Sequence, residues 1–180
     1  GYKGKIIRNY FKNFKKKWKI NLVETGANTM TGGRLKRLKK YLKDETFLMT
    51  YGDGLSNVNL KKLIAFHKKN KKTVTVTSVR PPARFGHLKI KGNIVKYFKE
   101  KSNLDEGWIN GGFFVIEPTF FDYISNDMTF LEREPLENIT KKNQLSAFKH
   151  EGFWQCMDTL RDKQKLDEIL KKKKFKKFFE

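Results

Sequence analysis

A strand, a helix and a second strand follow one another between residues 47 and 79, and this order constrains the fold more than any other feature. Phe47–Tyr51 is a nearly all-apolar run that stops at Gly52-Asp53-Gly54, as expected of a buried parallel strand that ends in a turn. Leu60–Lys69 places apolar side chains and His67 on one helical face, and Thr73–Val79 is a β-branched strand. Short links between these elements predict a βαβ unit of an α/β domain.

The rest of the chain alternates between helical and strand patterns in the same way. The periodicities predict these further elements: a helix over Tyr2–Lys17, a strand over Trp18–Val23, a helix over Arg34–Leu42, a β-hairpin of His87–Ile90 and Ile94–Phe98, a strand over Ile109–Ile116, helices over Pro118–Ile124 and Phe130–Lys142, a strand over Leu145–Lys149 and a helix over Leu160–Lys173. We expect one α/β domain with an antiparallel insertion over residues 1–170, followed by a basic-aromatic tail over residues 171–180.

Length and composition exclude several classes of protein. The chain has 180 residues and no run of about 18 apolar residues, so we expect no membrane-spanning helix. Its first twenty residues are rich in lysine and aromatic residues, unlike a signal peptide. The single cysteine, Cys156, excludes an internal disulfide and suits a reducing compartment. We interpret Cys156 as a small buried residue rather than a reactive thiol.

The net charge of +21 is concentrated at the two ends of the chain. Residues 1–19 carry a net +8 and residues 171–180 a net +5, which together make +13. The central chain is therefore only mildly basic, and attraction of polyanionic substrates such as nucleotides explains the charge better than specific nucleic-acid binding. Aromatic residues between the N-terminal lysines leave a nucleic-acid binder as an alternative, and the tail leaves contact with a membrane surface as another.

Two aspartates at predicted strand ends are the candidates for metal binding. Asp53 follows the first apolar strand, and Asp158 follows a second apolar-aromatic stretch. Open α/β sheets bind ligands at the carboxyl ends of their strands, and two carboxylates suit a hard cation such as Mg²⁺. Such an ion would bridge phosphates and neutralise charge in a phosphoryl transfer. The alternative is that both aspartates are ordinary turn residues.

Three other segments carry groups that suit phosphates and sugars. Lys101 is a candidate point charge for a phosphate, although it is one lysine among many. Asn110-Gly111-Gly112 suits hydrogen bonding to sugar hydroxyls, with a strand bulge as the rival interpretation. Thr31-Gly32-Gly33-Arg34 combines amides at a helix start with a guanidinium, which suits an anion or a base, with a turn and an N-cap as the alternative. Three scattered histidines and one cysteine predict no zinc site.

Taken in order, these segments are similar to the glucose-1-phosphate cytidylyltransferases, members of the sugar-phosphate nucleotidyltransferase superfamily. The resemblance covers almost the whole chain and rests on these motifs: Gly1-Tyr2-Lys3-Gly4, Leu22-Val23-Glu24-Thr25-Gly26, Met30-Thr31-Gly32-Gly33-Arg34-Leu35-Lys36-Arg37, Thr50-Tyr51-Gly52-Asp53-Gly54, Arg84-Phe85-Gly86, Ile109-Asn110-Gly111-Gly112-Phe113-Phe114, Glu134-Pro135-Leu136 and the stretch from Phe153-Trp154 to Asp162. Two of these motifs, around Asp53 and Arg34, resemble the cytidylyl branch more than the thymidylyl branch. The resemblance implies a Rossmann-like, mixed and mostly parallel sheet flanked by helices, with the hairpin as an antiparallel insertion.

The resemblance also implies a reaction and a set of site residues. Family members convert CTP and α-D-glucose 1-phosphate to CDP-glucose and pyrophosphate with Mg²⁺, and the product feeds dideoxyhexose synthesis for surface polysaccharides such as the O-antigen of lipopolysaccharide. The resemblance further implies a cytoplasmic homo-oligomer. It also implies a mechanism that forms no covalent enzyme intermediate. By resemblance, Asp53 and Asp158 bind the metal, Lys101 holds the sugar phosphate, Asn110 and Gly111 contact the hexose, and the nucleotide site is lined by Asn28, Thr31, Gly32, Gly33, Arg34 and Gly52.

The sequence departs from the family pattern in ways that bear on activity. Family members begin with a strand, a Gly-Gly-x-Gly-Thr-Arg loop and a Lys-Pro motif, and these 180 residues contain neither motif. We therefore expect that the first βα unit or units are missing from this sequence, and that these residues alone do not bind CTP productively. Ser102 and Asn28 stand where the family favours Pro and Ser, and the segment between Phe14 and Trp18 is short. The alternatives are a UTP- or dTTP-using relative and a non-catalytic binding protein on the same fold.

Overall fold

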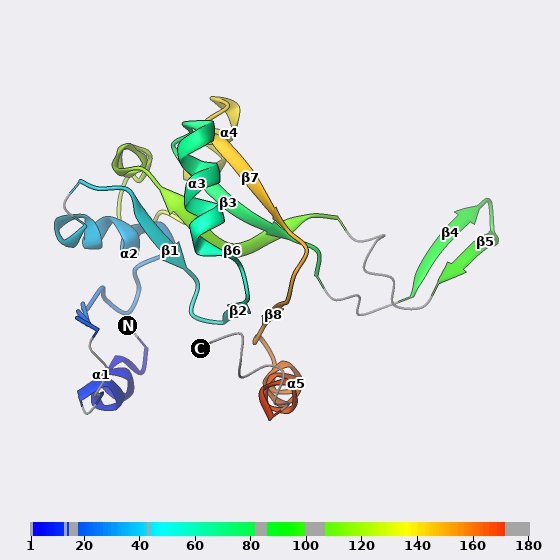
Figure 1. Cartoon of the computed structure of the whole chain (residues 1–180), viewed down its shortest axis with the longest axis horizontal. Helices are drawn as coiled ribbons and strands as arrows, with labels where there is room; N and C mark the ends of the chain where they lie inside the picture. Colours follow the sequence, from blue (N-terminus) through cyan, green and yellow to red (C-terminus); the bar gives the residue numbers. More distant parts are fainter. Residues whose placement is uncertain are drawn as a thin grey trace. The chain divides into compact units, whose positions relative to one another are not determined.

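The computed structural model describes residues 2–12, 14, 18–42, 44–81, 86–99 and 107–171 (Figure 1). The chain divides into two compact units. Unit 1 comprises Gly1–Phe47 and Glu117–Leu145, and unit 2 comprises Leu48–Ile116 and Ser146–Glu180. This division does not test independent folding, so the single domain expected over residues 1–170 stays a prediction. Residues 172–180 of the expected tail, and the candidate Lys101, lie outside the described residues.

A mixed four-stranded sheet carries the core of unit 2. Its strands in spatial order are β1 (Phe47–Thr50), β6 (Ile109–Ile116), β3 (Val74–Val79) and β7 (Leu145–His150). Strand β6 runs antiparallel to β3, and it also runs opposite to β1 (Figure 1). Thr75 bonds to Ser146 and Ser78 bonds to Phe148, so β7 runs parallel to β3. The mixed sheet is therefore confirmed, with β6 lying between the two strands of the predicted βαβ unit.

Helix α3 (Leu60–Asn70) covers one face of this sheet (Figure 1). It begins after Asn59, whose side chain accepts a hydrogen bond from the Lys62 amide at 2.9 Å, and it ends where Lys71 adopts a left-handed conformation. Leu63 and His67 are its buried residues. Because His67 Nδ1 lies 2.8 Å from the hydroxyl of a buried threonine on β3, this histidine has a structural role.

Unit 1 surrounds a small apolar core with helices and 3₁₀ helices. They are α2 (Thr31–Leu38), η1 (Lys39–Tyr41), η2 (Pro118–Tyr123) and α4 (Glu134–Lys141). The core side chains come from both sequence segments of the unit: Leu35, Phe120, Phe121, Ile124, Leu131 and Ile139. Phe47 stacks on Phe121, with ring centroids 5.7 Å apart.

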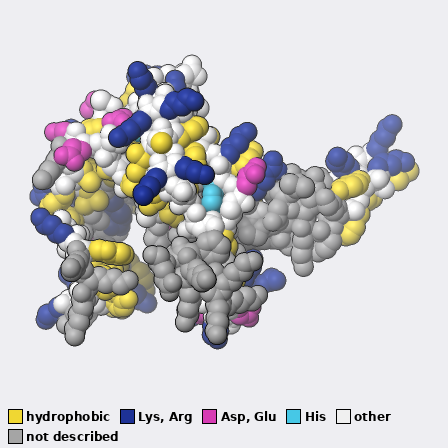
Figure 2. Space-filling view, in the orientation of Figure 1, with side chains coloured by type: hydrophobic (Ala, Val, Ile, Leu, Met, Phe, Trp, Pro, Cys, Tyr) yellow, Lys and Arg dark blue, Asp and Glu magenta, His cyan; other side chains and the backbone are white. Residues whose placement is uncertain are grey.

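Two short antiparallel ladders complete unit 2. Strand β2 (Gly54–Ser56) pairs with β8 (Trp154–Cys156), and β4 (His87–Lys91) pairs with β5 (Ile94–Lys99). The second pair confirms the predicted hairpin, whose turn residue Gly92 has the positive φ of 59° that glycine tolerates. Helix α5 (Leu160–Lys171) follows β8. On the face shown in Figure 2, Lys and Arg side chains are spread over several elements, including α3 and the hairpin.

The largest differences from prediction lie near the N-terminus. The predicted strand over Trp18–Val23 is wrong, since residues 18–26 contain no strand. The apolar residues of the alternating pattern, Trp18, Ile20 and Leu22, are exposed. A pattern of alternating apolar residues does not form a strand unless a neighbouring strand is available for pairing. Helix α1 is Gly4–Lys12, and residues 13 and 15–17 of the helix predicted over Tyr2–Lys17 lie outside the described residues. Helix α4 begins only at Glu134, later than predicted. Within the described ranges, every helix is too short or too polar to cross a membrane.

Candidate functional site

Asp53 and Asp158 lie at the same end of the β2–β8 ladder. The register pairs Gly54 with Cys156, and one step further the Met157 amide donates to the Asp53 carbonyl at 2.9 Å. Asp158 is the next residue, and both aspartates are exposed. Backbone pairing therefore makes neighbours of two segments that are about a hundred positions apart, as the metal-site hypothesis requires.

A bulge in β6 anchors both segments that carry these aspartates. The β3–β6 register shifts opposite Gly111 and Gly112. The Gly111 carbonyl accepts a hydrogen bond from Trp154 Nε1 at 2.8 Å, and the Gly112 carbonyl accepts one from the Tyr51 amide at 3.1 Å. The bulge thus holds Trp154 at the start of β8, which precedes Asp158, and Tyr51 directly after β1, which precedes Asp53.

Both glycines of the bulge are required by the space around them. Gly112 has a φ of +77°, and a Cβ on it would lie 2.9 Å from Tyr51 Cδ2. A Cβ on Gly111 would lie 2.8 Å from Val79 Cγ1 and 2.9 Å from the Thr77 carbonyl oxygen. The bulge interpretation of this motif is therefore confirmed, and contact with a sugar stays a prediction.

Asn110 is an exposed residue whose amide is ordered by two hydrogen bonds. Its Oδ1 accepts from the Gly112 amide at 2.8 Å, and its Nδ2 donates to the Tyr51 hydroxyl at 3.2 Å. Because a backbone N–H can only donate, its partner must be the oxygen, so the nitrogen of the amide is the atom that faces the Tyr51 hydroxyl. Sequence reasoning missed this role of Tyr51, since no local pattern indicates a contact across 59 positions.

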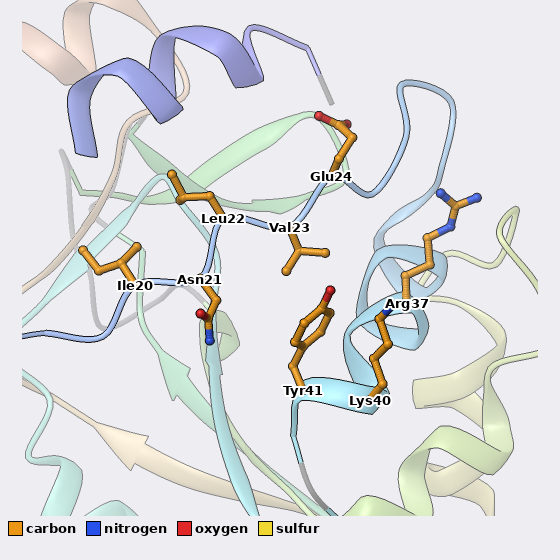
Figure 3. A pocket seen from close by; sticks show the side chains of 8 residues that line it. All are labelled: Ile20, Asn21, Leu22, Val23, Glu24, Arg37, Lys40 and Tyr41. Atoms are coloured by element: carbon orange, nitrogen blue, oxygen red, sulfur yellow. The ribbon is translucent and has the colours of Figure 1, made fainter. Parts of the chain in front are cut away.

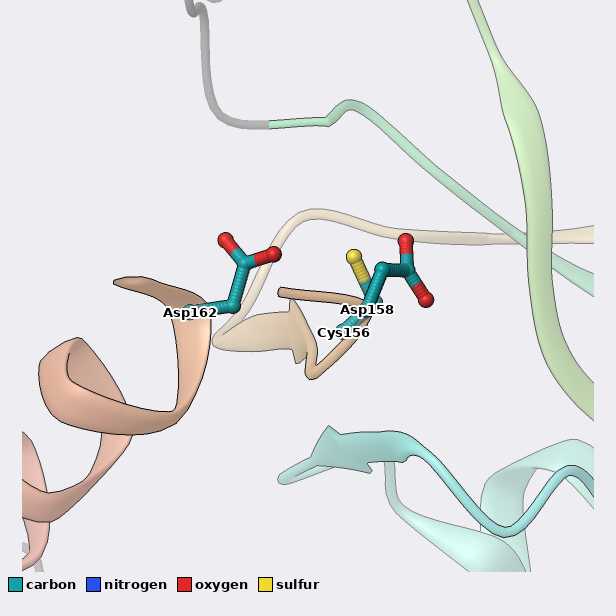
Figure 4. A group of neighbouring side chains, drawn as sticks. All are labelled: Cys156, Asp158 and Asp162. Carbon is teal, nitrogen blue, oxygen red and sulfur yellow. The ribbon is translucent and has the colours of Figure 1, made fainter. Parts of the chain in front are cut away.

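A third carboxylate, Asp162, lies beside Asp158 (Figure 4). Among the described residues, the ligand atoms of Cys156, Asp158 and Asp162 lie within 4.8 Å of one another, and Asp53 is not part of that cluster. Cys156 is half-buried rather than buried as predicted. Its thiol is a soft ligand, so a hard cation such as Mg²⁺ favours the oxygens of Asp158 over this sulfur.

Asp162 has a structural role that its sequence context could have indicated. Its Oδ2 accepts from the Thr159 hydroxyl at 2.8 Å and from the Thr159 amide at 3.1 Å. In return, Thr159 Oγ1 accepts from the Asp162 amide at 3.1 Å. These reciprocal bonds form a capping box at the start of α5, for which Thr-x-x-Asp is the signal. The cap fixes the chain direction immediately after Asp158.

The first turn of α2 is bonded to the chain that follows η2. The amides of Gly32 and Gly33 both donate to the Thr129 carbonyl, at 3.0 and 3.3 Å. Thr31 Oγ1 donates to the Glu132 carboxylate at 2.7 Å. The anion site expected at this helix start therefore lacks the two glycine amides, because they are already bonded within the protein.

Arg34 braces the loop that precedes α2. Its guanidinium donates to the Thr25 hydroxyl at 2.7 Å and to the carbonyls of Gly26 and Ala27 at 2.9 and 3.2 Å. Asn28 follows this braced loop and is exposed. The side chain of Arg34 thus orders the backbone beside Asn28, and a direct contact of either residue with a nucleotide stays a prediction.

The described site residues fall into two groups. Unit 1 holds Asn28, Thr31, Gly32, Gly33 and Arg34. Unit 2 holds Gly52, Asp53, Asn110, Gly111 and Asp158. Gly52 is exposed, and a Cβ added to it would meet no atom within 4 Å, so a ligand can approach its backbone.

An open pocket of ≈ 720 Å³ lies beside α2 in unit 1 (Figure 3). Its lining residues are Ile20, Asn21, Leu22, Val23, Glu24, Arg37, Lys40 and Tyr41. Arg37 pairs with Asp127, and Glu24 pairs with Arg8 at 3.1 Å, so the charges of these two lining residues are balanced. The predicted nucleotide residues do not line this pocket, which therefore gives no support to a nucleotide site there.

Arg37 and Asp127 form a two-point ion pair between α2 and the loop after η2. Arg37 Nε donates to Asp127 Oδ1 at 2.9 Å, and a second guanidinium N–H bonds to Oδ2. These hydrogen bonds hold the pKa of the Asp127 carboxyl below its usual value of 3.8. The pair is half-exposed, so its contribution to stability is small.

We expect Arg37→Ala to lower the melting temperature slightly at neutral pH and to have no effect in strong acid. A carboxyl whose pKa is lowered by folding adds stability above its unfolded pKa of about 4, and this stability is lost as the pH falls through the folded value. Thermal melts of both proteins at about pH 7 and about pH 2 test this prediction. An equal difference in melting temperature at both pH values would contradict it.

Comparisons with known proteins agree with this architecture. The profile of the family described as Nucleotidyl transferase matches residues 4–160. The glucose-1-phosphate cytidylyltransferase of Salmonella typhimurium is 44% identical over 197 positions, which cover 97% of this chain and 77% of that protein. Among solved structures, HddC from Yersinia pseudotuberculosis aligns with a TM-score of 0.71 at 22% identity, over 93% of this chain and 74% of the other. A UDP-glucose pyrophosphorylase complexed with UDP-glucose aligns with a TM-score of 0.64 at 15% identity, over 94% of this chain and 72% of the other. The structural likenesses show a shared Rossmann-like α/β fold.

Proposed function

Because this chain belongs to the nucleotidyl transferase family, and within it to the glucose-1-phosphate cytidylyltransferases, we propose that the full-length protein forms CDP-glucose and pyrophosphate from CTP and α-D-glucose 1-phosphate. The observation that carries this proposal is the 44% sequence identity to the glucose-1-phosphate cytidylyltransferase of Salmonella typhimurium over 97% of this chain. The position of Asp53 and Asp158 at one end of the β2–β8 ladder supports it, since the reaction requires charge neutralisation between two anionic substrates.

Two exposed carboxylates offer oxygen ligands, which fit Mg²⁺. Asp53 and Asp158 would hold this ion, which when bound neutralises negative charge on the phosphates. A phosphate oxygen of glucose 1-phosphate attacks the α-phosphorus of CTP, the bond from that phosphorus to the bridging oxygen breaks, and pyrophosphate leaves. The protein acts by positioning these groups and balancing their charge, without a covalent intermediate.

The binding residues divide between the two substrates. Lys101 would hold the sugar phosphate, and Asn110 would bind the hexose through its exposed amide. Gly111 would also contact the hexose, although its carbonyl is already bonded to Trp154. Asn28, Thr31 and Gly52 would contact the nucleotide.

Gly32, Gly33 and Arg34 would have a supporting part in this proposal. They would shape the nucleotide site through the bonds that order α2 and the loop before it.

We also propose the wider setting that the family resemblance implies. We place the enzyme in the cytoplasm as a homo-oligomer. Its CDP-glucose would supply reactions that make dideoxyhexoses for surface polysaccharides, including the O-antigen of lipopolysaccharide.

Pyrophosphate release by the full-length protein tests the proposed reaction. We expect release from CTP, glucose 1-phosphate and Mg²⁺ together, and at least about tenfold less from UTP or dTTP, because the nucleotide site must discriminate between bases. Faster release from UTP or dTTP would identify the alternative relative. Binding of CDP-glucose without turnover of any triphosphate would favour a non-catalytic binding protein.

A further inference from the structure

Tyr51 is attached to β6 at three points, although β1 ends one residue before it. Its backbone amide donates to the Gly112 carbonyl at 3.1 Å, and its hydroxyl accepts from Asn110 Nδ2 at 3.2 Å. Its ring packs edge-on against Phe114, with centroids 5.7 Å apart. The ring also covers Gly112 so closely that a Cβ there would lie 2.9 Å from it. Backbone, ring and hydroxyl therefore immobilise Tyr51 relative to the bulge.

The hydroxyl contact completes the ordering of Asn110. The Gly112 amide holds the oxygen of the Asn110 side chain, and Tyr51 holds its nitrogen. An Asn amide has two N–H donors and an oxygen with two lone pairs, so each end keeps one further bonding position. Because Asn110 is exposed, those positions suit two hydroxyls of a sugar, and an amide held in advance binds them without losing rotational freedom.

We propose that Tyr51 is a positioning residue, which sets the orientation of the Asn110 amide for the hexose of glucose 1-phosphate. This inference rests on the proposed function. Tyr51 acts through Asn110 and touches none of the reacting atoms. The same residue lies two positions before Asp53, so the segment that carries a metal ligand also orders the sugar-binding amide.

Tyr51→Phe tests this role, because it removes the acceptor and keeps the ring on Gly112. We expect the KM for glucose 1-phosphate to rise about five- to tenfold, as for the loss of one orienting hydrogen bond, while the KM for CTP changes less than about twofold. Tyr123→Phe is the matched control, since the ring of Tyr123 stacks on Phe120 in unit 1. It should leave both constants unchanged. An unchanged KM for glucose 1-phosphate in Tyr51→Phe would overturn the inference.

A double-mutant cycle separates positioning from general loosening of the fold. In an Asn110→Ala background, Tyr51→Phe should cause no further rise in the KM for glucose 1-phosphate, because its effect passes through the missing amide. A second, equal rise in that background would overturn the inference. The NMR signal of the Asn110 side-chain amide should move in Tyr51→Phe and stay in place in Tyr123→Phe. Failure of the proposed function would show differently, as an unmodified protein that forms no CDP-glucose.

Discussion

Replacing Asp53 or Asp158 by Asn is expected to lower the kcat/KM for CDP-glucose formation by about 100- to 1000-fold in the full-length protein. Each substitution keeps the size of the side chain and removes the charge with which a carboxylate holds Mg²⁺. Both side chains are exposed, so the melting temperature should stay within about 2 °C of the unmodified protein. The measurement is pyrophosphate release over a range of Mg²⁺ concentrations.

Asp167→Asn is the matched control for this prediction. Asp167 is exposed on α5 in the same unit and pairs with Lys163 at 3.2 Å, an interaction that contributes little to stability. We expect its turnover to change less than about twofold. Normal turnover and normal Mg²⁺ dependence in both Asp53→Asn and Asp158→Asn would contradict the metal assignment, whatever the control shows.

Gly33→Ala is expected to destabilise the protein by about 2 kcal/mol and to lower its melting temperature by roughly 4–8 °C. A Cβ on Gly33 would lie 2.4 Å from the Asp127 carbonyl oxygen and 2.5 Å from its Cα. These are backbone atoms, which cannot turn away as a flexible side chain does. Alanine favours a helix over glycine by only about 1 kcal/mol, so the steric cost decides the sign. Thermal and urea unfolding measure the change.

Gly107→Ala provides the comparison for that experiment. A Cβ on Gly107 would meet no atom within 4 Å, and the residue is exposed. We expect its free energy of unfolding to change by less than about 0.5 kcal/mol. If Gly33→Ala were as stable as Gly107→Ala, the close approach of α2 to Asp127 would not hold in solution.

Local patterns predicted most elements because each depends on residues near one another in the sequence. Helix α3 has its apolar face and its Asn59 cap within about twelve positions, and the hairpin has its turn at Gly92 between two strand-like runs. The strand expected over Trp18–Val23 is absent, and this failure shows the limit of prediction from local sequence patterns. Its alternating pattern is present, but strand formation also requires a partner, which no local pattern provides.

The candidate site was predictable as a set of residues and much less as an arrangement. Turn positions after apolar runs, together with the family resemblance, identified Asp53 and Asp158. The contact between their segments depends on the β2–β8 register, and the hydroxyl of Tyr51 reaches Asn110 across 59 positions. The roles of Gly32 and Gly33 also had to come from the structure, because their partner Thr129 is remote in the sequence.

The order of amino acids alone was enough to specify the α/β class, the hairpin and the family, and to propose the two aspartates as metal ligands, since periodicity, turn residues and motifs are local properties. The bulge at Gly111-Gly112, the braced loop beside Arg34 and the ordering of the Asn110 amide emerged only after the chain had folded. Each of these depends on hydrogen bonds between distant positions, and such bonds form only when strand register and side-chain packing bring their donors and acceptors within reach.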